Sequence, residues 1–144
     1  MKFTKTLVAG LILIGGVAFA QVVATDPDVI ARKDLMRANG GAAKALGGMA
    51  SGEMAFDAAA AEAAKAVLIA NAADIATKFT TNAVDPASGA KPEIWTNWDD
   101  FVIKAADLGK AAVALDATTV EGVQAGMGAI GGACKACHTA YKVQ

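Results

Sequence analysis

Apolar residues recur every three or four positions along four long stretches of the chain, and no stretch alternates apolar and polar residues as a strand would. The first stretch predicts a helix over about residues 27–50, with Thr25 or Asp26 as its N-cap and Pro27 in its first turn. Its apolar face is formed by Leu35, Ala42, Leu46 and Met49, with Asn39 in the same series. Most charged residues of this stretch, Arg32 among them, are expected on the other faces.

The second and third stretches predict helices of similar length. The second covers about residues 57–79, with Asp57 as its N-cap. Turn-forming residues dominate positions 80–91, which we expect to be the longest loop. The third stretch keeps its apolar spacing from about residue 93 to 115, so we expect one continuous helix there.

The fourth helix is predicted over about residues 118–141. A capping box, with Thr118 at the N-cap and Glu121 at N3, indicates where it begins. Mostly short connections and one apolar face per helix indicate an all-α fold, an antiparallel up-down-up-down four-helix bundle.

The sequence Cys134-Lys135-Ala136-Cys137-His138 lies on the last predicted helix and has the C-x-x-C-H spacing of covalent c-type haem attachment. Cysteines three positions apart on a helix emerge from one face, one turn apart, where two thiols reach the two vinyl groups of one porphyrin. The adjacent His138, the only histidine of the chain, is placed to ligate the iron from the proximal side. We therefore expect one covalently bound haem c.

Other uses of the two cysteines are a redox-active dithiol and a short local disulfide. A structural zinc site is nearly excluded, since zinc requires four nitrogen or sulfur ligands and the chain has two cysteines and one histidine. A thioredoxin-like dithiol would need a strand next to the motif, and the sequence around Cys134 predicts none.

Residues 1–20 have the pattern of a secretory signal peptide. Lys2 and Lys5 precede an apolar run over residues 7–19, and a small-x-small pattern at residues 18–20 predicts cleavage after Ala20. The apolar run is shorter than the about 20 residues that span a bilayer. Because haem is attached covalently outside the bacterial cytoplasm, the leader and the haem motif agree on a periplasmic protein without a membrane anchor, with one domain over residues 21–144.

The composition narrows the choice of partners. The 13 basic residues include Lys2 and Lys5, so removal of the leader leaves 11 bases and 14 acids. A mildly acidic chain without a run of basic residues gives no indication of nucleic-acid binding. Alanine-rich outer faces on residues 27–50 and 57–79 predict a homodimer through these two helices, since small side chains allow close approach.

Gly40 and Gly41 fall inside the first predicted helix, where each glycine costs about 1 kcal/mol relative to alanine. Close approach of a neighbouring helix or of the haem would explain the missing side chains. A break in the helix is the alternative.

With its haem motif on the last of four helices, the chain resembles the class II c-type cytochromes, the cytochrome c′ family with its low-spin c-556 and c-554 relatives. Supporting motifs are Tyr141, the stretch Lys91-Pro92-Glu93-Ile94-Trp95, Phe101, and Arg32 with Leu35-Met36. The resemblance implies that His138 is the proximal ligand, that Cys134 and Cys137 carry the thioethers, that Met36 faces the distal side of the iron, and that Arg32 lies near the haem propionates. Lys142 departs from the arginine that many high-spin members carry there, and it lacks the planar guanidinium.

Two functions follow from this resemblance. If Met36 ligates the iron, the haem is low-spin and the protein is an electron carrier that exchanges electrons with redox partner proteins. If Met36 only fills space, the alternative is a five-coordinate cytochrome c′ that binds NO or CO and protects against nitrosative stress. An enzyme is not expected, because no second histidine and no distal acid–base pair is available for proton transfer.

Overall fold

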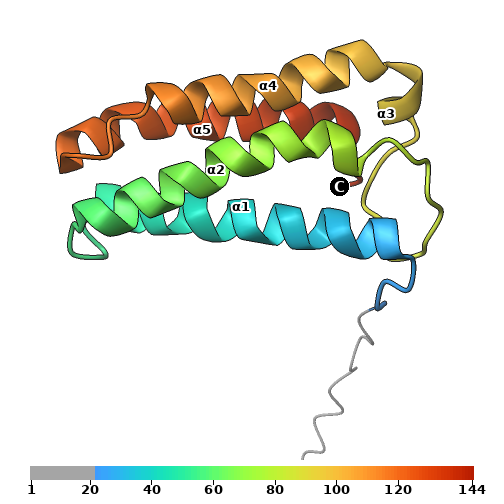
Figure 1. Cartoon of the computed structure of the whole chain (residues 1–144), viewed down its shortest axis with the longest axis horizontal. Helices are drawn as coiled ribbons and strands as arrows, with labels where there is room; N and C mark the ends of the chain where they lie inside the picture. The colour runs from blue at the N-terminus through green and yellow to red at the C-terminus, as the bar shows by residue number, and fades with distance from the viewer. Residues whose placement is uncertain (1–21) are drawn as a thin grey trace, which may run out of the picture.

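The structure is a computed structural model that describes residues 22–144, so the predicted leader and its cleavage site lie outside the described residues. Four long helices and one short helix form the fold (Figure 1). They are α1 (Pro27–Ser51), α2 (Ala58–Lys78), α3 (Glu93–Thr96), α4 (Trp98–Ala114) and α5 (Val120–Tyr141). Within residues 22–144, no helix is both long and apolar enough to cross a membrane.

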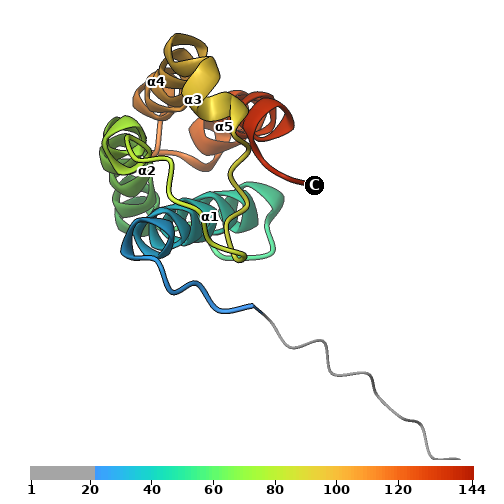
Figure 2. The same cartoon turned by 90° about the vertical axis from the view of Figure 1, so that its right-hand side faces the viewer.

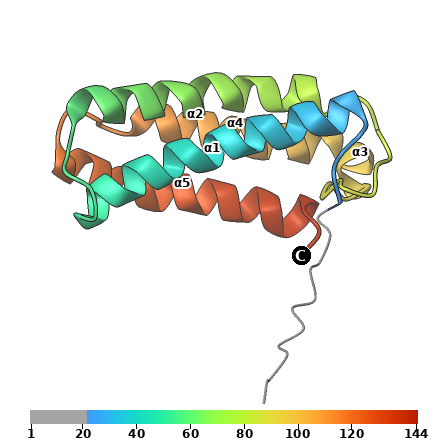
Figure 3. The ribbon, with the colours of Figure 1, turned by 90° about the horizontal axis from the view of Figure 1, so that it is seen from below.

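The long helices form an antiparallel four-helix bundle, which confirms the predicted fold class. Helix α1 packs against α2 and α5, and α4 packs against the same two helices, so the four helices surround one core. An end-on view shows this arrangement (Figure 2), and a view from below shows α1 and α5 side by side (Figure 3). Aromatic contacts fill the core near α3: the ring of Phe101 lies 5.2 Å from Phe79, 5.6 Å from Trp98 and 5.4 Å from Tyr141, measured between centroids.

The predicted starts of the first two helices are confirmed. The Asp26 carboxylate accepts hydrogen bonds from the backbone N–H groups of Asp28 (2.9 Å) and Val29 (3.1 Å), with Pro27 in the first turn. The Asp57 carboxylate accepts from Ala60 N (3.0 Å). Each cap supplies a partner for an N–H group that would otherwise have none within its helix.

The third predicted helix is not continuous. Asn97, with φ −124° and ψ 46°, leaves the helical region and separates α3 from α4. The break turns α3 back toward the end of α2, where the indole N–H of Trp95 donates to the Phe79 carbonyl oxygen (2.8 Å). The regular spacing of apolar residues over 93–115 did not indicate this bend, which the hydrogen bond between Trp95 and Phe79 stabilises.

The predicted capping box of the fourth helix is wrong by one residue. Thr119 is the N-cap, and its hydroxyl oxygen accepts from Gly122 N (3.0 Å). Thr118 is instead engaged by Asp116, whose Oδ1 accepts from the Thr118 amide (2.9 Å) and hydroxyl (2.6 Å). The local Asp116 turn thus competes successfully for the residue that the sequence assigned to the cap.

Gly40 and Gly41 do not break α1, which runs through them. A Cβ atom built at either glycine would meet no protein atom within 4 Å. Close packing of a neighbouring helix is therefore not the reason for these glycines. Space for the haem remains the prediction.

Candidate haem site

A cavity of about 270 Å³ lies between the first half of α1, the end of α5 and the loop that joins α2 to α3. It brings together four of the five predicted site residues: Arg32, Met36, Cys137 and His138. Cys134 lies one turn before Cys137 on α5 and does not line the cavity. The lining also includes residues that the sequence did not single out for the site, namely Val29, Phe79, Ile94 and residues 87–90 of the loop.

The register between α1 and α5 explains how Met36 comes to face His138. A Cβ atom built at Gly47 would lie 3.8 Å from Met127 Cε, and the Gln124 amide donates to the Ala50 carbonyl oxygen (2.8 Å). Because the helices are antiparallel, residue numbers rise along α1 while they fall along α5. Continued toward the cavity, this register places Gly40 at the level of Cys134.

Three exposed glycines lie near this level on α1 and α5. A Cβ atom built at Gly40, Gly131 or Gly132 would meet nothing within 4 Å. Gly40 shares the face of α1 that carries Met36 and Gly47, since it lies four positions after Met36 and seven positions before Gly47. The three exposed glycines, called the glycine strip below, add no side chains beside Cys134, which leaves room for a planar cofactor joined to both cysteines.

Arg32 is buried, with 3% of its surface exposed, although the sequence placed it on a polar face. Its Nε–H donates to the Lys78 carbonyl oxygen (2.9 Å), and Nη2 donates to the Thr81 carbonyl oxygen. The guanidinium also lies over two rings, 4.9 Å from the centroid of Phe79 and 5.4 Å from that of Trp95. Burial lowers the pKa of Arg32, and the nearby carboxylates of Asp28 and Asp26 oppose that shift.

The third nitrogen of this guanidinium, Nη1, is buried and has no hydrogen-bond partner. A buried cationic N–H group without an acceptor is costly, so such a group is expected to meet an anion or another acceptor. Because Arg32 lines the cavity, a haem carboxylate fits this donor. The apolar lining, the two thiols and the neighbouring histidine likewise fit the haem that the C-x-x-C-H motif predicts.

Both thiols are partly buried and unpaired, so no disulfide joins them. Burial raises the pKa of Cys134 and of Cys137 above the usual value of a thiol. Burial also lowers the pKa of His138, and the positive charge of Lys142 lowers it further. A neutral imidazole is the form that ligates a metal, so this environment favours the ligating state of His138.

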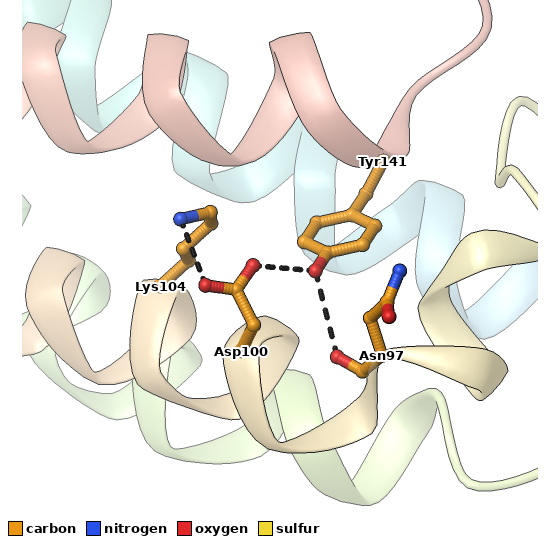
Figure 4. Close-up of polar contacts among 4 residues, drawn as sticks. All are labelled: Asn97, Asp100, Lys104 and Tyr141. Carbon is orange, nitrogen blue, oxygen red and sulfur yellow. Dashed lines mark hydrogen bonds and ion pairs between the residues drawn. The ribbon is translucent and has the colours of Figure 1, made fainter.

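A hydrogen-bonded group behind the end of α5 was not foreseen from the sequence (Figure 4). The Tyr141 hydroxyl donates to Asp100 Oδ2 (2.5 Å) and lies 3.4 Å from the Asn97 carbonyl oxygen. Lys104 Nζ lies 3.1 Å from the other carboxylate oxygen of Asp100. The hydrogen bond to Asp100 raises the pKa of Tyr141 to about 12. This group joins the last turn of α5, which carries His138, to the first turns of α4.

A short antiparallel bridge closes the cavity at its outer end. Lys91 N donates to the Tyr141 carbonyl oxygen and Val143 N to the Gly89 carbonyl oxygen, both at 2.9 Å. Gly89 and Lys142 line the cavity from the two sides of this bridge. The loop that forms one wall is therefore attached to the helix that carries the haem motif.

Comparison with known proteins assigns the chain and its fold to one family. The family model described as Cytochrome C′ matches residues 28–142, which include all five helices except the first residue of α1. The chain belongs to the cytochrome c′ family. Its cofactor is accordingly one covalent haem c, and Cys134 and Cys137 are consistent with the C-x-x-C-H motif of its attachment.

Relatives with two different names are similar to this cytochrome. Cytochrome c-556 from Agrobacterium fabrum is 36% identical over 143 residues, which cover 97% of this chain and 96% of the relative. The solved structure of cytochrome c′ from Rhodopseudomonas palustris has a TM-score of 0.76 at 25% identity, covering 83% of this chain and 98% of the other. A structural model of oxidised cytochrome c556 from the same species has a TM-score of 0.74 at 28% identity, with the same coverage.

Proposed function

We propose that this cytochrome is a periplasmic electron carrier. Its haem is bound through thioethers at Cys134 and Cys137, with His138 as the proximal ligand and Met36 as the distal ligand. The observation that carries the proposal is that Met36 of α1 lines the same cavity as His138 of α5. A thioether on the second axial position makes the haem six-coordinate and raises its reduction potential, which suits exchange of single electrons.

The other methionines of the described chain support the choice of Met36. Met49 is 2% exposed in the bundle core, Met54 is half exposed after the end of α1, and Met127 lies beside Gly47. None of these three side chains lines the cavity. Met36 is thus the candidate that needs no rearrangement of the helices.

The alternative is a five-coordinate cytochrome that binds NO or CO. Apolar side chains from Val29, Phe79 and Ile94 line the cavity near Met36, and such a lining suits a small uncharged ligand. Relatives named cytochrome c′ are consistent with it. The two functions differ in whether the Met36 sulfur occupies the position that the gas would take.

Spectra of the ferric and ferrous protein, recorded for the wild type and for Met36→Ala, test the proposal. We expect a low-spin wild type with a weak sulfur-to-iron band in the ferric state and slow CO binding. Met36→Ala should be high-spin, bind CO readily and have a lower reduction potential. Met54→Ala, which removes a methionine outside the cavity, is the matched control. A high-spin wild type whose spectrum and potential do not change in Met36→Ala would refute the carrier and support the gas-binding function.

A catalytic function is not proposed. Among the described residues, the cavity lining contains no aspartate or glutamate, and His138 is assigned to the iron.

We also propose a homodimer through the outer faces of α1 and α2. Ile30 and Val67 are 40% and 37% exposed on these helices, beside many alanines. Sedimentation at micromolar protein concentration should show a dimer. A monomer at all concentrations would contradict this interface.

A further inference from the structure

Basic residues that are far apart in the sequence gather along the two flanks of the α1–α5 interface. On α1 they are Lys33, Arg37 and Lys44, which lie four and seven positions apart and share one side of the helix. The other flank has Lys135 of α5 and Lys142, the extended residue that follows α5. All five side chains are exposed.

These flanks border the haem site. Lys33 and Lys142 line the cavity itself, from α1 and from the end of α5. Lys142 is close enough to His138 to lower the pKa of the imidazole. The glycine strip of Gly40, Gly131 and Gly132 lies beside these flanks, and a Cβ atom built at any of the three would meet nothing within 4 Å. These three positions therefore place no side chain of their own between a partner and the haem site.

The flanks are richer in bases than the rest of the molecule. Residues 22–144 contain 11 bases and 14 acids, and the flanks hold five of those bases. Asp34 pairs with Arg37 at 2.5 Å. Asp85 binds the Ala87 amide while Lys33 binds the Ala87 carbonyl oxygen, and Asp100 is close enough to act on the pKa of Cys137. The exposed bases outnumber these acids, so this face is more positive than the chain as a whole.

We propose that the α1–α5 face is the docking surface for an acidic patch on a redox partner protein. This inference rests on the proposed electron-carrier function and adds the charge of the partner and the place where it binds. Complementary charge steers the partner so that its acidic patch meets the face under which the haem lies. The glycine strip shortens the approach, because electron transfer needs the two redox centres close together.

An anionic membrane is a less suitable partner for the same charges. A helix that binds a membrane surface inserts large apolar side chains between its basic residues. The exposed large apolar residues of the described chain include none within residues 33–44 or 131–142, and those that adjoin the flanks, Val22, Val23, Ile30 and Val143, lie at one end of the face, beyond Lys33 and Lys142. A protein surface, which meets charge with charge and needs no insertion, fits this face.

Oxidation of the ferrous protein by hexacyanoferrate(III) tests the steering. The reagent accepts one electron, giving hexacyanoferrate(II) and ferric haem. A trianion should be repelled by a chain of net negative charge, so net charge predicts a rate that rises with added salt. Local docking predicts the opposite, a rate that falls as ionic strength increases.

A double variant that reverses two charges on the flanks is compared with a double variant that reverses two charges on α2 and α4. Lys44→Glu/Lys135→Glu should lower the rate at low salt by about tenfold and reverse its salt dependence. The control Lys65→Glu/Lys110→Glu, on α2 and α4, makes an identical change in net charge and should change the rate less than about twofold. A wild-type rate that rises with salt, or equal losses in both double variants, would overturn the proposal.

A binding measurement that involves no electron transfer locates the site. The redox-inert paramagnetic anion hexacyanochromate(III) should broaden the backbone NMR signals of residues 33–44 and 131–142 of the holoprotein. Broadening elsewhere would contradict the docking surface, and flank-dependent co-sedimentation with phosphatidylglycerol vesicles would replace the protein partner with a membrane. Spectra of Met36→Ala do not depend on the flanks, so failure of the electron-carrier function and failure of this docking surface give different results.

Discussion

Replacing the buried Arg32 with methionine should destabilise the protein and also change its redox behaviour. Methionine keeps an unbranched apolar side chain in the site but donates no hydrogen bond. The Lys78 and Thr81 carbonyl oxygens, which close the end of α2, then lose their donors. The contacts with the Phe79 and Trp95 rings lose their cationic component.

These losses allow a magnitude to be estimated. A hydrogen bond from a charged donor contributes about 1.5–3 kcal/mol, and a cation–π contact about 0.5–2 kcal/mol. Two such hydrogen bonds and two rings, discounted for the packing that methionine restores, give a loss of about 3–5 kcal/mol. For a domain of this size, that corresponds to a fall in Tm of roughly 10–20 °C.

The assay combines thermal melts of the holoprotein with redox potentiometry of wild type, Arg32→Met and Arg32→Lys. If Arg32 Nη1 meets a haem carboxylate, removing its positive charge favours the ferric haem and lowers the potential. Arg32→Lys keeps the charge and should hold the potential near that of the wild type. Its Tm should still fall, because an ammonium group does not reproduce the planar fork of donors.

Two results would refute this reasoning separately. An unchanged potential in Arg32→Met would show that the guanidinium does not lie beside the haem and serves only to join α1 to α2. A loss of less than about 1 kcal/mol would show that water replaces the donors at the Lys78 and Thr81 carbonyls.

Three further predictions concern other groups. Replacing both Cys134 and Cys137 with serine should abolish covalent haem on a haem-stained denaturing gel, whereas either single variant should retain one thioether at most. Hydrogen bonds from the backbone N–H groups of Asp26, Thr25 and Ala87 lower the pKa of Asp85 from 3.8 to about 2. The stabilisation by ionised Asp85 is therefore complete above pH 3.8 and is lost as the pH falls through 2. Thermal melts of Asp85→Asn should lack this acid dependence. The hydrogen bond to Asp100 raises the pKa of Tyr141 from 10.0 to about 12. The stabilisation by this hydrogen bond is therefore complete below pH 10 and is lost as the pH rises through 12. Carbon NMR of labelled tyrosine, of which the chain has one, should show an ionisation near pH 12, and Asp100→Asn should lower that pKa.

Local sequence signals predicted the helices well where one residue dominates the choice. Asp57 has no competing neighbour and forms the expected cap. Asp26 caps the first helix, while its competitor Thr25 is bound by Asp85. At residues 116–119 three side chains compete, and the Asp116 carboxylate takes Thr118 before it can cap the helix. The break at Asn97 depends on a hydrogen bond between Trp95 and Phe79, which are on different elements. Sequence spacing contains no information about such a bond.

The chemistry of the site was more predictable than its arrangement. The C-x-x-C-H spacing alone indicates haem, since its chemistry lies within five residues. Arg32, by contrast, was assigned to the surface because it is charged, although it falls in the helical series of Leu35 and Asn39. Its burial depends on carbonyl groups and rings that the end of α2 and α3 supply only after folding. The basic flanks were missed for the same reason, because α1 and α5 meet only in the bundle.

At one end of the bundle the helices are joined by short connections, whereas at the haem end hydrogen bonds join residues that are far apart in the sequence. Away from the haem site, short connections at residues 52–57 and 115–119 join neighbouring helices. At the haem end, Asp85 bonds Thr25 and Asp26, and Asp100 bonds Tyr141, across separations of 41 to 60 positions. Closing a long loop costs more entropy than closing a short one, so contacts at the haem end are expected to form last.

Late closure suits covalent attachment of the haem. The thiolate is the reactive form of a cysteine, and burial in the folded bundle raises the pKa of both thiols. While the haem end is still open, Cys134 and Cys137 remain hydrated and closer to the ordinary reactivity of a thiol. We therefore expect the attachment residues to be enclosed late, so that haem attachment accompanies the final closure of the bundle.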